Sequence, residues 1–367
     1  MKTKFLHIAT ALLFVGFTSS CSDFLDRYPL DELSDSSFWK TENDAMMAVT
    51  DIYGCLPTWD QDEDINSDNA VHGIKWAAGN ISKGVYDPMD QSWAGSYTPI
   101  RQCNLVLEKV KDIEMSDESR KKIEGQAYFF RAFVYFNLIR SFGDVPYIDK
   151  PLNLTDVEDI TRTPREEVYA KVMADFDKAI EYLPEEWDAA NTPRVTKGAA
   201  LAMKARAALY YNNWQVAADA SKAVMDLGKY ELYDAGNTGK YQELFWEKSD
   251  GCDENILYVQ FNYPDKTHYL IGWECFPTLG WGGMNPTQSL VDAFEDKDGA
   301  PISKSTIYNE KDPFKNRDPR LEVNVLHDGE EMYGVTIKVK PLKSSGKTGI
   351  EPVSYTHLRA HETRRHL

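Results

Sequence analysis

The sequence predicts a mostly α-helical protein, in which antiparallel helix pairs of the tetratricopeptide kind form a scaffold for an irregular, loop-rich face. Apolar residues recur at helical spacing almost without a break from Pro99 to about residue 228. Small residues at the expected helix contacts allow close packing, as stacked repeats require. The segments 57–95 and 229–352 show no sustained period. An irregular helical bundle would use the same residues and remains an alternative.

Three helices are predicted in the first part of the chain. The first covers residues 34–56 and has its N-cap within 34–36. The second covers 99–112, and the third covers 117–142. Because the third segment is apolar nearly all round, we expect neighbours to pack on every side of it.

The fourth helix has the clearest start signal. Thr163 is the expected N-cap, Pro164 the first helical residue, and Glu166 the partner that completes a capping box. Its apolar stripe ends at Leu183, and Pro184 stops the helix.

A helix pair follows. An alanine-rich helix begins at Thr196, and Asn212 and Asn213 form a tight turn after it. The second helix of the pair covers 214–227, and Gly228 provides its C-terminal stop. This pair has the form of a degenerate tetratricopeptide repeat.

Beyond residue 228 we expect shorter elements. The runs 256–261 and 335–339 are strand-like, and 286–295 reads as a short helix. The chain therefore divides into a helical region, 21–228, which contains the loop 57–95, and an irregular region, 229–352.

The N-terminal segment resembles a signal peptide that ends at a lipidated cysteine. Residues 1–20 combine a basic start with an apolar run of 13 residues, 5–17, which is too short to span a bilayer. Cys21 follows directly and is the predicted lipidation site. Acyl chains on this residue would anchor the protein to a membrane. Thr18 stands where the usual lipoprotein box has Leu, so an ordinary secreted protein with a structural cysteine is the alternative.

The charge and the motifs narrow the possible functions. The net charge of −17 disfavours nucleic acid and other polyanions as partners. Phosphate-binding glycine loops, nucleophile elbows and zinc-protease motifs are missing from the sequence. We therefore predict a binding protein, not an enzyme, without a cofactor or metal. Paired carboxylates for glycoside hydrolysis remain an alternative, because their separation depends on the fold.

Two further patterns are weaker. The acidic run Asp60, Asp62, Glu63 and Asp64 offers oxygen ligands for calcium, but Ile65 stands where an EF-hand loop needs Gly, so a solvated loop is the better interpretation. Cys252 and Cys275 are the only pair that we consider for a disulfide, and isolated thiols are the favoured interpretation.

Several stretches together resemble one family, the SusD/RagB outer-membrane glycan-binding lipoproteins of Bacteroidetes. Their order along the chain carries the resemblance more than any single stretch. They are Cys21-Ser-Asp-Phe-Leu-Asp26, Ser36-Ser-Phe-Trp39, Gln126-Ala-Tyr-Phe-Phe-Arg-Ala132, Arg140-Ser-Phe-Gly-Asp-Val-Pro146, Thr163-Pro-Arg-Glu-Glu167, Asn285-Pro-Thr-Gln-Ser-Leu-Val-Asp-Ala-Phe294 and Asn316-Arg-Asp-Pro-Arg-Leu321.

The resemblance implies a surface-exposed lipoprotein of the outer membrane. It implies an oligosaccharide ligand and a partner, a SusC-like TonB-dependent transporter, over which such proteins sit as a lid. A lipoprotein glycoside hydrolase and a peptide-binding transporter lid are the alternatives.

The end of the chain departs from the family pattern. Family members continue with further helices past about residue 340. Residues 353–367 are basic and rich in histidine, unlike the acidic body. We interpret this segment as a non-native tail on a C-terminally truncated chain.

Aromatic residues in the irregular segments are the predicted glycan-binding residues. Neutral sugars bind through flat aromatic faces, with amide or carboxylate groups at the hydroxyls. Ordinary core packing is an equally good interpretation for any single ring. We expect Trp76 and Trp281 first. The further candidates are the rings Tyr86 and Trp273 and the polar residues Asp68, Asn69 and Asn80.

Overall fold

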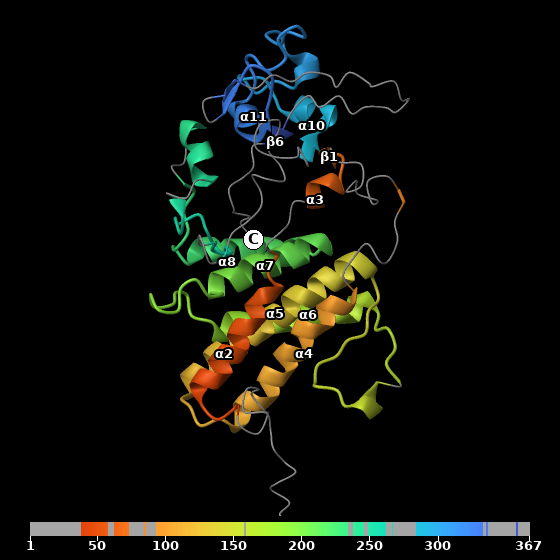
Figure 1. The fold of residues 1–367 in the computed structure, drawn as a ribbon, viewed down its shortest axis with the longest axis vertical. Coiled ribbons are helices and arrows are strands. Elements are labelled where there is room, and N and C mark those ends of the chain that lie inside the picture. The colour runs from red at the N-terminus through yellow and green to blue at the C-terminus, as the bar shows by residue number, and fades with distance from the viewer. Residues whose placement is uncertain are drawn as a thin grey trace, which may run out of the picture.

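The computed structural model separates a group of long helices from a group of short elements (Figure 1). The long helices gather in the lower part of the view, and the short helices and strands lie above them. The structure describes residues 38–57, 62–72, 84–85, 93–157, 159–233, 238–245, 249–261, 266, 284–332, 335–336 and 357–358.

The long helices confirm the predicted mostly α-helical fold. Short 3-10 turns extend or connect several of them. The helices are α2 (Glu42–Ile52), α4 (Trp93–Lys109), α5 (Asp117–Phe142), α6 (Arg165–Tyr182), α7 (Lys197–Tyr210) and α8 (Trp214–Asp226). The 3-10 turns are η2 (Tyr53–Cys55), η5 (Val110–Asp112), η6 (Leu154–Asp156), η7 (Thr238–Phe245) and η9 (Ile302–Lys304).

Helix α5 is the centre of the main core. It contacts α2, α4, α6 and α7, so its apolar residues are buried around most of its circumference. Phe129, Phe130 and Tyr135 are fully buried, and Phe129 meets Phe176 of α6 edge to face. Each such ring contributes about 2 kcal/mol through the area that it removes from water. The all-round apolar pattern of 117–142 is thus explained.

Helix α2 starts later than predicted. Residues 38–41 are not helical, Trp39 has a positive φ of 52°, and the N-cap is Thr41, not a residue within 34–36. The Thr41 hydroxyl accepts from the Asp44 backbone N–H, and the Asp44 carboxylate accepts from the Thr41 N–H. This reciprocal capping box satisfies two N–H groups at the start of the helix.

The predicted helix starts at Pro99 and Thr163 are also corrected. Helix α4 begins at Trp93 and contains Pro99 inside it. Helix α6 begins at Arg165, and the backbone N–H of Arg165 donates to the Asp144 carboxylate at 2.9 Å. The expected capping box therefore does not form: a cap from 21 positions upstream takes its place.

Helices α7 and α8 confirm the predicted antiparallel pair. Thr196 caps α7 through its hydroxyl, and Asn212 takes a φ of 58° in the turn to α8. Gly228 follows α8 with a φ of 61°, as a C-terminal stop requires. This pair packs on the rest of the scaffold through α6.

The short elements form a second structural group. They are α3 (Asp62–Ile65), β1 (Ala70–His72), β2 (Met284–Pro286), α10 (Gln288–Ala293), α11 (Pro319–Asn324), β3 (Val325–Leu326), β4 (Glu331–Met332), β5 (Val335–Thr336) and β6 (His357–Leu358). Antiparallel pairs join β1 to β2, β3 to β6 and β4 to β5. The predicted strand at 256–261 is wrong, because those residues form turns and irregular backbone. The helix predicted at 286–295 is shorter, because its first residue, Pro286, belongs to β2.

Candidate functional site

The pairing of β1 with β2 joins the two irregular regions of the chain. Ala70 lies opposite Pro286, Val71 opposite Asn285, and His72 opposite Met284. In Figure 1 β1, drawn in orange, lies among the blue elements from the end of the chain. Predicted glycan-binding residues belong to both regions of the sequence. We call this pair of strands the β1–β2 ladder.

A small core and a helix cap hold the ladder. Ile65 of α3, Ala70 and Met284 bury their side chains against one another. Thr287 follows β2 directly, and its backbone N–H donates to the Asn69 carbonyl at 2.8 Å. The Thr287 hydroxyl donates to the Asp68 carbonyl and accepts from the Leu290 N–H at the start of α10. Thr287 therefore caps α10 and holds the segment that directly precedes β1.

The register brings the two loops to one end of the ladder. Because the strands are antiparallel, the chain leaves β1 after His72 at the end where it enters β2 at Met284. Trp76 stands four positions after His72, and Trp281 three positions before Met284. The described chain thus leaves β1 and enters β2 at the same end of the ladder, although more than two hundred positions separate His72 from Met284 in the sequence.

Asp68 and Asn69 lie at the opposite end of the ladder. One strand length, about 10 Å, separates them from the end at His72. The Asp68 side chain is exposed and that of Asn69 is half-buried, while both carbonyls bind Thr287. Their described role is therefore to join the backbone of β1 to α10.

The other predicted site residues lie outside the described part of the chain. They remain predictions, as does the lipidation of Cys21. The residues are Trp76, Asn80, Tyr86, Trp273 and Trp281.

Sequence reasoning missed a polar network inside the scaffold. Arg131 and Asp175 form a buried two-pronged ion pair with both N···O distances at 2.7 Å. Asn104 accepts from Arg131 at 2.8 Å and donates to the Ile148 carbonyl at 2.9 Å. Arg131 belongs to one of the stretches that carry the family resemblance, so the signal was visible, but its structural role was not.

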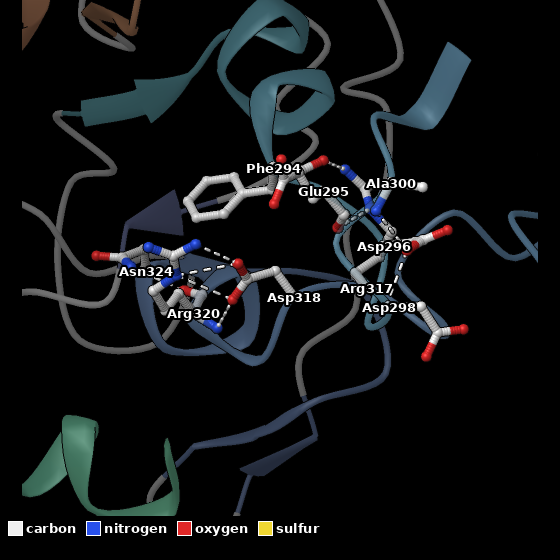
Figure 2. Close-up of polar contacts among 9 residues, drawn as sticks. All are labelled: Phe294, Glu295, Asp296, Asp298, Ala300, Arg317, Asp318, Arg320 and Asn324. Carbon is white, nitrogen blue, oxygen red and sulfur yellow. Dashed lines mark hydrogen bonds and ion pairs between the residues drawn. The ribbon is translucent and has the colours of Figure 1, made fainter. Parts of the chain in front are cut away.

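A second network surrounds the stretch 316–321 (Figure 2). Arg317 is buried, and its guanidinium donates to the carbonyls of Val291, Phe294 and Pro313 at 2.5, 2.9 and 2.8 Å. All described hydrogen bonds of this guanidinium are therefore to backbone carbonyls. Burial lowers the pKa of Arg317.

The neighbouring Asp318 and Arg320 form an ion pair of their own. Asp318 caps α11 by accepting from the Arg320 N–H at 2.8 Å. The Arg320 side chain is largely exposed and meets the Asp318 carboxylate, which lowers the pKa of Asp318.

The described residues hold no group of three metal-ligating side chains. Asp64 is half-buried in the short helix α3, and the side chains of Asp60, Asp62 and Glu63 lie outside the description, so the calcium alternative is untested.

Cys55, Cys103 and Cys252 are free thiols. Cys275 lies outside the described residues. No described helix has the length and apolar character to cross a membrane.

Two family models match the chain. The model described as starch-binding and associating with the outer membrane matches residues 24–209, and the model described as the SusD family matches 245–361. The second match extends into the segment 353–367, and β6 within that segment pairs with β3. The chain belongs to the SusD/RagB family.

Relatives and solved structures agree with this assignment. A SusD-like protein of Formosa agariphila is 29% identical over 276 residues, which are 71% of this chain and 53% of that protein. A SusD-like protein of Bacteroides ovatus is 25% identical and covers 71% of this chain and 50% of its own length. This chain thus spans about half the length of the curated relatives that it matches.

A solved SusD-like protein of Bacteroides fragilis superposes with a TM-score of 0.78 at 27% identity, over 91% of this chain and 71% of that one. A structure described as a laminarin-binding SusD-like protein superposes with a TM-score of 0.65 at 19% identity, over 87% of this chain and 77% of that one, a likeness of fold alone.

Proposed function

We propose that the protein captures oligosaccharide at the cell surface and passes it to a SusC-like TonB-dependent transporter. The lipidated Cys21 would tether it to the outer membrane. Capture needs no bond cleavage, and the protein acts in this proposal without a catalytic residue or a cofactor.

The observation that carries the proposal is the register of the β1–β2 ladder. Since the chain leaves β1 and enters β2 at the same end of this ladder, we expect the loops that contain Trp76 and Trp281 to present their aromatic faces to one ligand. Tyr86, Trp273 and Asn80 belong to the same two loop segments. Two aromatic faces on one sugar chain would contribute a few kcal/mol to the binding free energy through the area that they bury. The match to the family model described as starch-binding supports a carbohydrate as the ligand class.

Trp76→Ala and Trp281→Ala test the site. We expect each variant to lower the affinity for the best-bound member of a glycan panel, which includes soluble starch and laminarin, by at least tenfold, because each removes one stacking face. Isothermal titration calorimetry measures the affinity. Trp214→Ala is the matched control: this indole is 61% exposed on α8, in the helical group, and its loss should leave the affinity unchanged. Unchanged affinity in both loop variants would refute the site.

Two rival functions give different results. A glycoside hydrolase would release reducing sugar from the panel, whereas the proposed protein binds without product. A peptide-binding lid would keep its peptide when free oligosaccharide is added. For delivery, a SusC-like TonB-dependent transporter should co-purify with the lipidated protein, and a Cys21→Ser variant should lose its membrane association.

A further inference from the structure

Arg317 connects two segments that are not adjacent in the sequence. Its guanidinium donates to the carbonyl of Val291 in α10 and to that of Phe294 directly after it. Figure 2 shows Arg317 and Phe294. The backbones run side by side as well, since Lys297 N–H donates to the Asn316 carbonyl and Asp318 N–H to the Glu295 carbonyl, each at 2.9 Å. The C-terminal end of α10 is therefore fastened to the loop that precedes α11.

The other end of α10 is fastened to the β1–β2 ladder. Thr287 caps the helix and binds the carbonyls of Asp68 and Asn69. Helix α10 has only six residues, Gln288–Ala293, and such a short helix has little stability of its own. Its position is therefore determined by Arg317 at one end, by the ladder at the other, and by the packing of Val291 on Leu321 and Val325.

We propose that Arg317 is a positioning residue for the β1–β2 ladder and, through it, for the candidate glycan site. The inference rests on the proposed function for its last step only. The first step, from Arg317 through α10 to β1, concerns described residues alone.

The chemistry explains why this position holds arginine. The helix end presents carbonyls that no N–H within α10 reaches, and the planar fork of the guanidinium meets several of them at once. Lysine carries a point charge without the fork and cannot bridge Val291, Phe294 and Pro313 with the same geometry. Tyr308 covers the guanidinium at 5.5 Å and closes the site from water.

Hydrogen exchange measured by mass spectrometry on the full chain, without ligand, tests the first step. In Arg317→Lys we expect exchange about tenfold faster in 68–72 and 284–294, because both ends of the ladder assembly loosen. Exchange in α5 and α6 should not change, which shows that the scaffold is folded. Arg320→Gln is the control from the same stretch, since the described contacts of the Arg320 side chain are with Asp318.

Thr287→Val provides a second variant that leaves Arg317 intact. It removes the hydroxyl that binds the Asp68 carbonyl and keeps the backbone N–H. We expect faster exchange in 68–72 here too, again with α5 and α6 unchanged. If 68–72 exchanges at the wild-type rate in both variants, the positioning role is refuted.

Binding of laminarin and soluble starch tests the last step. We expect Arg317→Lys to lower the affinity for these glycans at least fivefold at a temperature where α5 remains protected from exchange. Arg320→Gln should bind them with the wild-type affinity. Wild-type affinity in Arg317→Lys would refute the link to the site even if the exchange changes. If the wild-type protein binds no member of the glycan panel, the proposed function fails, while the exchange result still decides the role of Arg317.

Discussion

The Asp296 carboxylate shows how one residue organises a loop. It accepts from the N–H groups of Asp298 and Ala300 at 2.9 Å and from the Ser305 hydroxyl (Figure 2 draws the first two partners). These hydrogen bonds, with that of Ser305 the strongest, lower the pKa of Asp296 below its ordinary value of 3.8. The ionised form is thus favoured in the folded loop.

This shift predicts an acid-sensitive loop. A carboxyl whose pKa is lower in the folded state stabilises the fold above pH 3.8, and this stabilisation is lost as the pH falls through the folded pKa. We expect hydrogen exchange in 294–305, corrected for intrinsic rates, to show a loss of protection that begins as the pH approaches 3.8 and continues below it.

Asp296→Asn should lower the protection at pH 6 and flatten this dependence. Asp298→Asn is the control, because its exposed carboxylate pairs only with Lys297 among the described contacts. An Asp296→Asn variant with the full wild-type pH dependence would show that other carboxyls cause it.

At the scale of elements, one buried ion pair joins three helices. Arg131 of α5 meets Asp175 of α6 and Asn104 of α4, and both charged side chains are less than a tenth exposed. The guanidinium also lies over the Tyr128 ring at 5.4 Å. The pair fixes the relative register of the helices, because its hydrogen bonds form in one arrangement only.

Asp175→Asn should lower the free energy of unfolding by about 3–5 kcal/mol, because it leaves the guanidinium buried without a counter-charge. Urea unfolding followed by circular dichroism measures it. The matched control is Asp177→Asn on the same helix, whose carboxylate is 59% exposed and pairs with Lys204. Loss of the Asp177–Lys204 ion pair should lower the free energy of unfolding by less than about 1 kcal/mol. A cost for Asp175→Asn as small as that of the control would contradict the structural role of the pair.

At the scale of the whole molecule, the described residues bury their apolar side chains in separate cores. The main core lies among α2, α4, α5, α6 and α7. A much smaller one joins Val291, Leu321 and Val325, with Phe294 and Phe314 at its edge. A core of this size buries little apolar area, so we expect the short elements to open before the helices do.

Leu321→Ala tests this separation. Leu321 is fully buried, and its truncation should cost about 2–5 kcal/mol within the small core. Limited proteolysis should then cut within 284–332 and leave a fragment that contains α4 to α8. Leu209→Ala, at a side chain 52% exposed on α7, should give the wild-type pattern. Simultaneous loss of both groups would show that the cores unfold as one.

The sequence predicted the helices where local signals and packing agree. The bounds of α5 match its apolar run, and Thr196 and Gly228 mark α7 and α8 as expected, because caps and stops act within a few residues. The starts of α2 and α6 were missed, since a later capping box decided the first and a distant group, the Asp144 carboxylate at Arg165, the second. The start of α4 at Trp93 was missed as well.

The candidate site shows the same division. Composition and motif order alone determined the family, the mostly helical class and the residue types suited to sugar. Only the tertiary structure decided that β1 pairs with β2, and that Arg317 reaches the ladder through α10. Strand register and contacts between distant residues are set by the burial of Ile65, Ala70 and Met284 and by hydrogen bonds across more than two hundred positions. No periodicity within a single segment encodes such contacts, because they depend on the folded arrangement of all segments together.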